Sequence, residues 1–238
     1  MPDTFAALLA EQLRSDPGRP LVTFYDDATG ERVELSVATY ANWVAKTSSL
    51  LVEELDLERG GRLLVDLSTH WLTPVFLGAA WTVGMSVVGA AVTSATGADA
   101  VVCGPDGLEL YADRAADVPV VACALRPLGV RFAEPLPDGV HDFGVEVWSQ
   151  PDAFIPWDPA TGEDEALPGV SQRELTARPA VHLEPGGRLL TTVSPLSDPA
   201  TMVEALVTGG STIWVRNPDH DALPKKYDDE RATARLVE

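Results

Sequence analysis

The chain has 238 residues, of which 36 are acidic and 17 basic, so its net charge is −19 and its pI is about 4.4. This negative charge opposes binding to nucleic acid and to anionic membrane surfaces. A hydrophobic content of 45% and a mean hydropathy of +0.04 exclude a wholly disordered chain and allow a sizeable core.

The N-terminal region predicts a helix, a hairpin and a second helix. Thr4 is placed to cap a helix that runs to Ser15 and carries an apolar stripe. Strands at 21–25 and 31–35 flank the loop DDATG, whose glycine is typical of a hairpin connection. Ser36 then caps a long helix with one apolar face.

The run from Leu63 to Ala91 predicts a strand, a helix and a second strand. The sequence LLVDL is suited to a buried strand, and the Ser-Thr pair after it is suited to a helix cap. Pro74 is tolerated in a first helical turn, and Gly84 is placed to end the helix in a left-handed cap. The second strand covers 85–90, so we expect a parallel unit with a right-handed crossover.

No charged residue lies between Asp66 and Asp99, a run long enough to raise the question of a membrane span. Prolines, glycines and a change from helical to strand period interrupt it, so no membrane span is expected. The N-terminus lacks the basic lead and apolar core of a secretion signal. Cys103 and Cys123 lie in apolar runs typical of buried thiols in a reducing compartment. We therefore expect a cytoplasmic protein and, since no zinc-type spacing of Cys and His occurs, no metal site.

The rest of the chain predicts short strands and helices. Strands are expected at 98–103, 118–125, 130–133, 188–193 and 211–215, with a short edge strand at 108–111. Residues 142–149 fit a helix by context and a strand by their Val and Trp content, and both interpretations stay open. Helices are expected at 171–177, from Asp198-Pro199 to Val207, and from Asp228 onward.

Together these elements predict an α/β fold of three layers, in which a mixed, mostly parallel sheet is flanked by helices. Residues 155–169 are rich in Pro, Gly and acidic side chains and are interpreted as a boundary or an exposed loop. The expected organisation is therefore an α/β core at 1–154, the loop at 155–169, and a second α/β segment at 170–238 that packs against the core.

Several motifs occur in an order that resembles the start of acyl-adenylate-forming enzymes. They are Phe24-Tyr25-Asp26 with Val33-Glu34-Leu35-Ser36 and Tyr40-Ala41, Asp56 to Arg62, Leu63 to Ala91, Val170 to Leu175, and Leu189 to Val215. In the same order, they resemble five features of that family. These are its hairpin with T-Y-x-E-L, its motif L-G-V-x-x-G-D-R, its strand–helix–strand core, its motif V-x-x-T-H-R-N-L, and its P-L-x-H strand with the next helix and strand. The chain thus resembles the AMP-binding superfamily of acyl-CoA synthetases and adenylation domains, and within it an uncharacterised group of actinobacterial proteins. The resemblance implies the fold of part of that family's N-terminal domain.

The chemistry of that family needs a Gly/Ser/Thr-rich loop ending in Pro-Lys-Gly, whose backbone N–H groups and lysine hold a triphosphate. At that place this chain has Thr161, Gly162, Glu163, Asp164 and Glu165. One alignment replaces the loop with these acids, and another, which pairs Asp164 to Leu167 with the family's D-x-A-x, deletes the loop. Neither alignment leaves a lysine, so ATP is not expected to bind and no cofactor is expected.

Other positions depart from the family in the same direction. The family's pocket histidine falls at Asp198, whose simpler role is to cap the helix that begins there. The chain ends before the family's adenine-binding strand, its ribose-binding aspartate and its mobile C-terminal domain. The resemblance therefore implies no catalytic residue, and adenylation by this chain alone is not expected.

Two groups of polar residues lie where predicted strands run into helices, the place where ligands bind in open α/β sheets. The first group is Ser68, Thr69 and His70, and the second is Ser194, Ser197 and Asp198. A Ser/His/Asp set drawn from both would be typical of a hydrolase, although no G-x-S-x-G elbow is present. Helix capping and a first-turn histidine explain the same residues without any ligand. These six positions are the candidate pocket.

The sequence therefore predicts a non-catalytic relative of adenylating enzymes that binds a small metabolite or a protein partner. Two alternatives remain: a remodelled enzyme that acts on an acyl or CoA-type substrate, and one half of a split adenylating enzyme. Surface that the ancestral domain would have covered leaves room for a homodimer.

Overall fold

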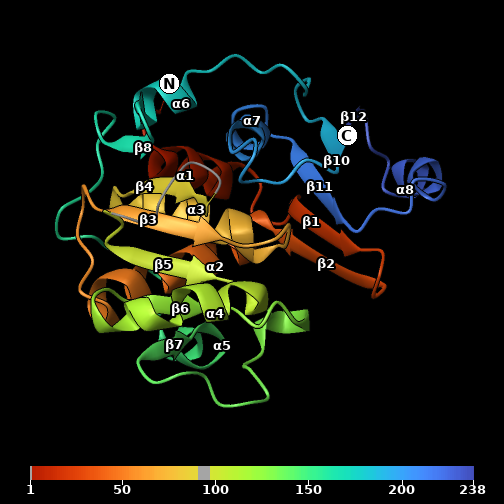
Figure 1. Ribbon diagram of the computed structural model, residues 1–238. Coiled ribbons are helices and arrows are strands. Elements are labelled where there is room, and N and C mark those ends of the chain that lie inside the picture. The colour runs from red at the N-terminus through yellow and green to blue at the C-terminus, as the bar shows by residue number, and fades with distance from the viewer. Residues whose placement is uncertain (1, 91–96) are drawn as a thin grey trace.

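The computed structural model describes residues 2–90 and 97–238, and within them the strands form two five-stranded sheets (Figure 1). The first sheet has the order β12-β10-β11-β1-β2, with β12 at Ala234–Leu236, β10 at Arg188–Thr191, β11 at Ser211–Arg216, β1 at Pro20–Asp26 and β2 at Glu31–Ser36. The second has the order β4-β3-β5-β6-β7, with β4 at Ser86–Gly89, β3 at Arg62–Asp66, β5 at Ala100–Cys103, β6 at Val120–Ala122 and β7 at Val140–Asp142. A two-stranded ribbon joins β8 (Glu165–Leu167) to β9 (Val170–Ser171).

The helices cover the sheets and fill the space between them (Figure 1). They are α1 (Phe5–Ser15), α2 (Val37–Ser49), α3 (Leu72–Val83), α4 (Leu108–Tyr111), α5 (Phe143–Glu146), α6 (Gln172–Thr176), α7 (Ala200–Val207) and α8 (Leu223–Asp229). Helix α2 continues into a π-helical turn at Leu50–Glu54. The α/β class, with parallel and mixed sheets flanked by helices, is confirmed.

Local sequence signals placed the first elements correctly. The Thr4 hydroxyl accepts a hydrogen bond from Ala7 N at 3.2 Å and caps α1, and Ser36 caps α2 in the same way through Thr39 N. Strands β1 and β2 pair antiparallel across the predicted hairpin. Side-chain capping thus fixes where both helices begin, because it satisfies amide groups that have no partner inside the helix.

The predicted strand–helix–strand unit is also confirmed. Strands β3 and β4 pair parallel, with Leu64 beside Val88, and α3 connects them. Gly84 ends α3 with φ of 91°, in the left-handed region that favours glycine. Helix α3 is buried on nearly its whole surface because α1 and α2 pack against it.

Of the two interpretations left open for residues 142–149, the helical one holds from Phe143 to Ser149, and Asp142 ends β7. Three short segments differ from the prediction. Leu108–Tyr111 is helix α4 instead of an edge strand. No strand forms at 130–133, because β7 at Val140–Asp142 pairs with β6 at that position of the sheet. The terminal helix α8 begins at Leu223, ahead of Asp228, and β12 follows it.

The first sheet draws its strands from both ends of the chain. In Figure 1, β1 near the N-terminus lies beside β11 near the C-terminus, and the two pair parallel with Phe24 opposite Trp214. One of the core clusters has members from Phe5 to Trp214 and includes residues of both sheets. The division at 155–169 into separate units stays a prediction.

A buried glutamine joins three helices in that core. Gln172 Oε1 accepts a hydrogen bond from Phe5 N at 2.9 Å, and Gln172 Nε2 donates to Trp81 O at 2.7 Å. Helix α6 is therefore attached to the start of α1 and to α3, and the segment that follows 155–169 is anchored against the core.

Candidate functional site

Ser68 and Thr69 follow β3, but neither caps the next helix. Helix α3 begins at Leu72, and no side-chain hydrogen bond caps it, so the predicted Ser-Thr cap is wrong. The exposed Ser68 hydroxyl instead accepts a hydrogen bond from Arg216 Nη1 at 3.1 Å, and its carbonyl accepts one from Thr73 Oγ1 at 3.1 Å. The loop after β3 is thus attached to the end of β11.

His70 lies fully inside the protein. Its ring packs against Phe24, with centroids 4.9 Å apart, and Nδ1 accepts a hydrogen bond from Leu72 N at 3.2 Å. Burial, and then the positive charge of Arg216, lower the pKa of His70 to about 3, although Asp26 opposes this shift. The imidazole is therefore neutral at physiological pH, and this buried position keeps it away from solvent.

An ion pair beneath His70 was not foreseen from the sequence. Asp26, at the end of β1, is 2% exposed; its carboxylate accepts a hydrogen bond from Asn217 Nδ2 at 2.8 Å and lies 3.2 Å from Arg216 Nη2. Burial raises the pKa of Asp26, but these partners and the amide of Ala28 outweigh it and hold that pKa below its usual value. Arg216 thereby connects the ends of β1, β3 and β11.

Ser194, Ser197 and Asp198 lie in the turn between β10 and α7. Ser197 N and Asp198 N both donate to Ser194 O, and Ser194 Oγ accepts from Leu196 N at 3.2 Å. The predicted Asp198 cap is wrong, since Pro199 is the residue before α7 and no side-chain bond caps the helix. Asp198 Oδ2 instead lies 3.9 Å from His182 Nε2. Within residues 2–90 and 97–238, no hydrogen bond or ion pair joins this group to the one at 68–70.

The segment predicted to replace the phosphate loop is held by Arg59. Arg59, in the turn before β3, donates from Nε and Nη2 to the two carboxylate oxygens of Asp164 at 2.8 and 2.9 Å. Its other contacts are Asp158 Oδ1 at 2.9 Å and Thr161 Oγ1 at 3.0 Å. The hydrogen bonds that Arg59 donates to Asp164 and Asp158 raise its pKa, so it stays charged. Because a bidentate pair of this kind fixes both distance and orientation, the segment has a defined conformation.

The residues next to Asp164 are also held by contacts within the protein. Glu163 pairs with Arg173 Nη1 at 2.9 Å, and Gly162 O accepts a hydrogen bond from Arg173 N at 2.9 Å. Glu165 begins β8, and its carboxylate accepts a hydrogen bond from Gly169 N at 2.8 Å. The ribbon also holds α3, because Trp81 Nε1 donates to Ala166 O at 2.8 Å. Residues 155–169 are therefore more ordered than a free exposed loop.

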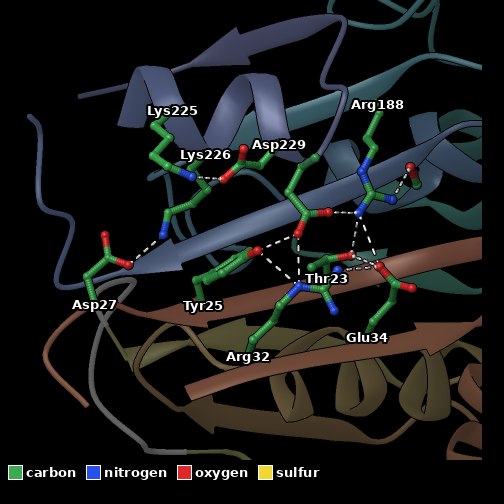
Figure 2. Close-up of polar contacts among 11 residues, drawn as sticks. Thr23, Tyr25, Asp27, Arg32, Glu34, Arg188, Lys225, Lys226 and Asp229 are labelled. Atoms are coloured by element: carbon green, nitrogen blue, oxygen red, sulfur yellow. Dashed lines mark hydrogen bonds and ion pairs between the residues drawn. The ribbon is translucent and has the colours of Figure 1, made fainter. Parts of the chain in front are cut away.

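A cluster of charged side chains that includes Arg32, Glu34 and Arg188 lies against strands of the first sheet (Figure 2). Glu230, just after α8, accepts hydrogen bonds from Arg32 Nε at 2.8 Å, from the Tyr25 hydroxyl and from Arg188 Nη2. Burial raises the pKa of Glu230, but these three partners lower it to about 2. The cluster attaches α8 to β1, β2 and β10, which makes it a structural link between the chain ends.

A cavity opens between β2, α2 and the segment that leads from β6 to α5. Its volume is about 680 Å³, and Trp43, Trp71 and Trp148 contribute to its wall. Their convergence was missed because the three residues lie far apart in the chain.

Cys103 and Cys123 are buried and unpaired, as predicted, and burial raises the pKa of Cys103 to about 12. In the described part of the chain, no three His, Cys, Asp or Glu side chains are grouped to hold a metal ion. No helix among these same residues is long and apolar enough to cross a membrane.

Comparison with known proteins gives one relative of similar length. No family model matches the chain. A protein of Mycobacterium tuberculosis described as a TIGR03089 family protein is 36% identical over 242 residues, which cover 97% of this chain and 96% of that protein. The similarity therefore extends over nearly all of both proteins.

Solved structures share the fold over about half of their length. An acyl-CoA synthetase of Brucella canis matches with a TM-score of 0.78 and 16% identity, over 97% of this chain and 47% of that one. Acetoacetyl-CoA synthetase from Streptomyces lividans matches with a TM-score of 0.77 and 16% identity, over 99% and 42%. The N-terminal domain of FACL13 from Mycobacterium tuberculosis matches with a TM-score of 0.72 and 14% identity, over 96% and 61%. At these identities the likeness shows the fold alone.

Proposed function

The chain belongs to the TIGR03089 family, and we propose that it is a binding protein that uses the N-terminal fold of adenylate-forming enzymes without performing adenylation. The observation that carries this proposal is the pairing of Arg59 with Asp164 at the place of the phosphate loop. A segment held by this pair serves the protein's own structure instead of a nucleotide.

The electrostatics of that segment support the proposal. Glu163, Asp164 and Asp158 lie close together, and the cations nearest to them, Arg59 and Arg173, are already paired with these acids. A polyphosphate at this place would need to displace a bidentate carboxylate and would then meet negative charge. Like charges at contact distance repel by about 1 kcal/mol each even in water.

ATP–pyrophosphate exchange with a panel of carboxylic acids tests the proposal. We expect no exchange from the wild-type protein, and exchange with any acid refutes the proposal. The matched variants are Asp164→Asn, which frees Arg59 from its main partner, and Glu109→Gln, an exposed acid elsewhere on the surface. If the pair blocks a nucleotide, calorimetry will detect more Mg-ATP binding to Asp164→Asn than to the wild type or to Glu109→Gln.

The two alternatives predict different outcomes. Half of a split enzyme would show exchange only after addition of an adenylation fragment encoded beside its gene. A remodelled enzyme would turn over an acyl-CoA and would lose that turnover in Asp198→Ala. The burial of His70 argues against its contact with such a substrate.

A further inference from the structure

The segment at residues 152–158 presents two large apolar side chains to solvent. Ile155 is 88% exposed and Trp157 is 96% exposed, and one residue separates them in the chain. Phe154 points the other way, since it is partly buried and packs against the core. Exposed apolar side chains that lie close together are typical of an interaction surface. We call residues 152–158 the tryptophan segment.

The backbone of the tryptophan segment is restrained at both ends. Asp152 Oδ1 lies 3.0 Å from Lys46 Nζ, and Asp158 Oδ1 lies 2.9 Å from Arg59 Nη1. Pro156 stands between the two exposed residues, where its ring fixes φ and restricts the residue before it. Because less conformational freedom remains to be lost, a partner binds side chains on such a segment at a lower entropic cost.

A cavity of about 360 Å³ lies beside the tryptophan segment. Trp157 lies at its edge, and the apolar part of its lining comes from Val52, Leu57, Val83 and Phe154. The π-helical turn after α2, the end of α3 and the tryptophan segment thus each contribute to it. A partner therefore meets an apolar recess next to two apolar projections.

The charge around this cavity is negative. Glu58 and Asp158 line it, Glu53 lies in the adjoining π-helical turn, and all three are exposed. Arg59 also lines the cavity, but its guanidinium is already shared between Asp158 and Asp164. Among the described residues, no basic side chain forms an ion pair with Glu53 or Glu58. This face therefore favours a partner that brings positive charge.

Other occupants fit this charge less well. In a two-fold dimer through this face, both copies would bring Glu53 and Glu58 to the same interface, because such an interface uses one patch twice. Each copy also carries a net charge of −19, so the two would repel. The same charge opposes nucleic acid and anionic membranes. A basic protein partner remains as the occupant that the charges attract.

We propose that the tryptophan segment and the cavity beside it dock a basic, amphipathic segment of another protein. Its apolar side chains cover Ile155 and Trp157, and its Lys or Arg side chains lie near Glu58. A cation over the exposed indole of Trp157 adds to this attraction. The proposal rests on the binding role proposed above and names the site and the kind of partner.

Titration with three peptides tests the kind of partner. Each peptide has two repeats of the pattern XLXXLXX, where X is lysine in the first, glutamine in the second and glutamate in the third. Nitrogen-15 spectra of the full chain resolve the tryptophan indole N–H groups, and Trp157→Ala identifies the Trp157 signal by its loss. We expect the lysine peptide to bind tightest, to shift the Trp157 signal, and to bind more weakly as salt is added.

Two pairs of variants test the location. Trp157→Ala should weaken binding of the lysine peptide about tenfold, and Glu58→Gln about twofold to threefold. The matched controls are Leu110→Ala and Glu109→Gln, exposed residues of α4 that lie outside the cavity, and neither should change binding. Trp157 is 96% exposed, so its removal leaves the core packing intact, and the spectra of the wild-type chain need no variant to fold.

The outcomes are distinct. Tighter binding of the glutamine or glutamate peptide, an unshifted Trp157 signal, no binding of the lysine peptide, or equal weakening by a variant and its control overturns the proposal.

The other occupants have outcomes of their own. A dimer mass in sedimentation that Trp157→Ala reduces to a monomer would assign the face to a second copy. A Trp157 signal shifted by phosphatidylcholine vesicles would assign it to a lipid surface, and either result also overturns the proposal. Failure here leaves the absence of adenylation intact, since the exchange assay measures that separately.

Discussion

The neutral state of buried His70 makes the stability of the fold depend on pH. Its pKa is about 3 in the folded protein and about 6.5 in an unfolded chain, so the unfolded chain binds a proton between these values and the folded protein does not. The free energy of unfolding therefore falls as the pH drops below about 6.5. At pH 5 the loss is roughly 2 kcal/mol, since each pH unit in this window changes the free energy by about 1.4 kcal/mol.

Urea unfolding of wild type and His70→Asn at several pH values measures this loss. The asparagine amide oxygen can replace Nδ1 as the acceptor for Leu72 N, and it does not titrate. We expect a lower stability of His70→Asn at pH 7, from lost packing against Phe24, but a smaller decline from pH 6.5 to pH 5. His220→Asn, at an exposed histidine, is the control and should keep the wild-type decline.

Equal declines in wild type and His70→Asn would refute this reasoning. Such a result would mean that His70 accepts a proton in the folded state, and hence that solvent reaches a ring found here at 0% exposure. His70 would then return as a candidate for contact with a ligand.

Three further changes test links in the fold. Gly78→Ala places a Cβ in overlap with the Tyr40 hydroxyl and should destabilise the protein by about 1–3 kcal/mol in urea unfolding, whereas Gly89→Ala, with no atom within 4 Å, should not produce this clash. Glu230→Gln should lower the free energy of unfolding at neutral pH by about 2 kcal/mol. Because the pKa of Glu230 is about 2 in the folded protein, the difference in stability between wild type and Glu230→Gln should shrink as the pH falls below about 4.5. A difference that stays constant at acid pH would contradict this prediction. Ser171→Ala removes the hydroxyl that accepts from Glu174 N, but keeps the backbone N–H that donates to the Glu174 carboxylate. The loss of this half of the capping box should lower the melting temperature, by the equivalent of about 1 kcal/mol.

The fold could be predicted where local chemistry decides it. The caps at Thr4 and Ser36 and the left-handed Gly84 act through residues within one helical turn, so the sequence alone reveals them. The strand near residue 140 was missed because β7 is three residues long and its place depends on pairing with β6. Residues 130–133 include Val130 and Phe132 and fit the same local pattern, so only pairing with β6 decides which of the two segments forms the strand.

The site could be predicted less well, because its contacts join distant parts of the chain. Arg59 and Asp164 are 105 residues apart, and Arg216 and Ser68 are 148 apart. Arg59 lies in the segment Asp56 to Arg62, which resembles a family motif, but that resemblance does not indicate its partner, and Arg216 belongs to no motif. The burial of His70 likewise depends on Phe24, from a strand of the other sheet. Sequence reasoning found the strand ends correctly, but it could not show which side chains were already engaged.

The acidic segment that the sequence aligns with the phosphate loop is attached to the core of the fold. Arg59, in the turn that leads into β3, donates to the Asp164 carboxylate, and Trp81, on α3, donates to Ala166 O. The Asp164 carboxylate is thus an acceptor that fixes the segment to the core. On the function proposed above, we expect this contact and nucleotide binding at the same position to exclude each other, because a carboxylate there repels a phosphate.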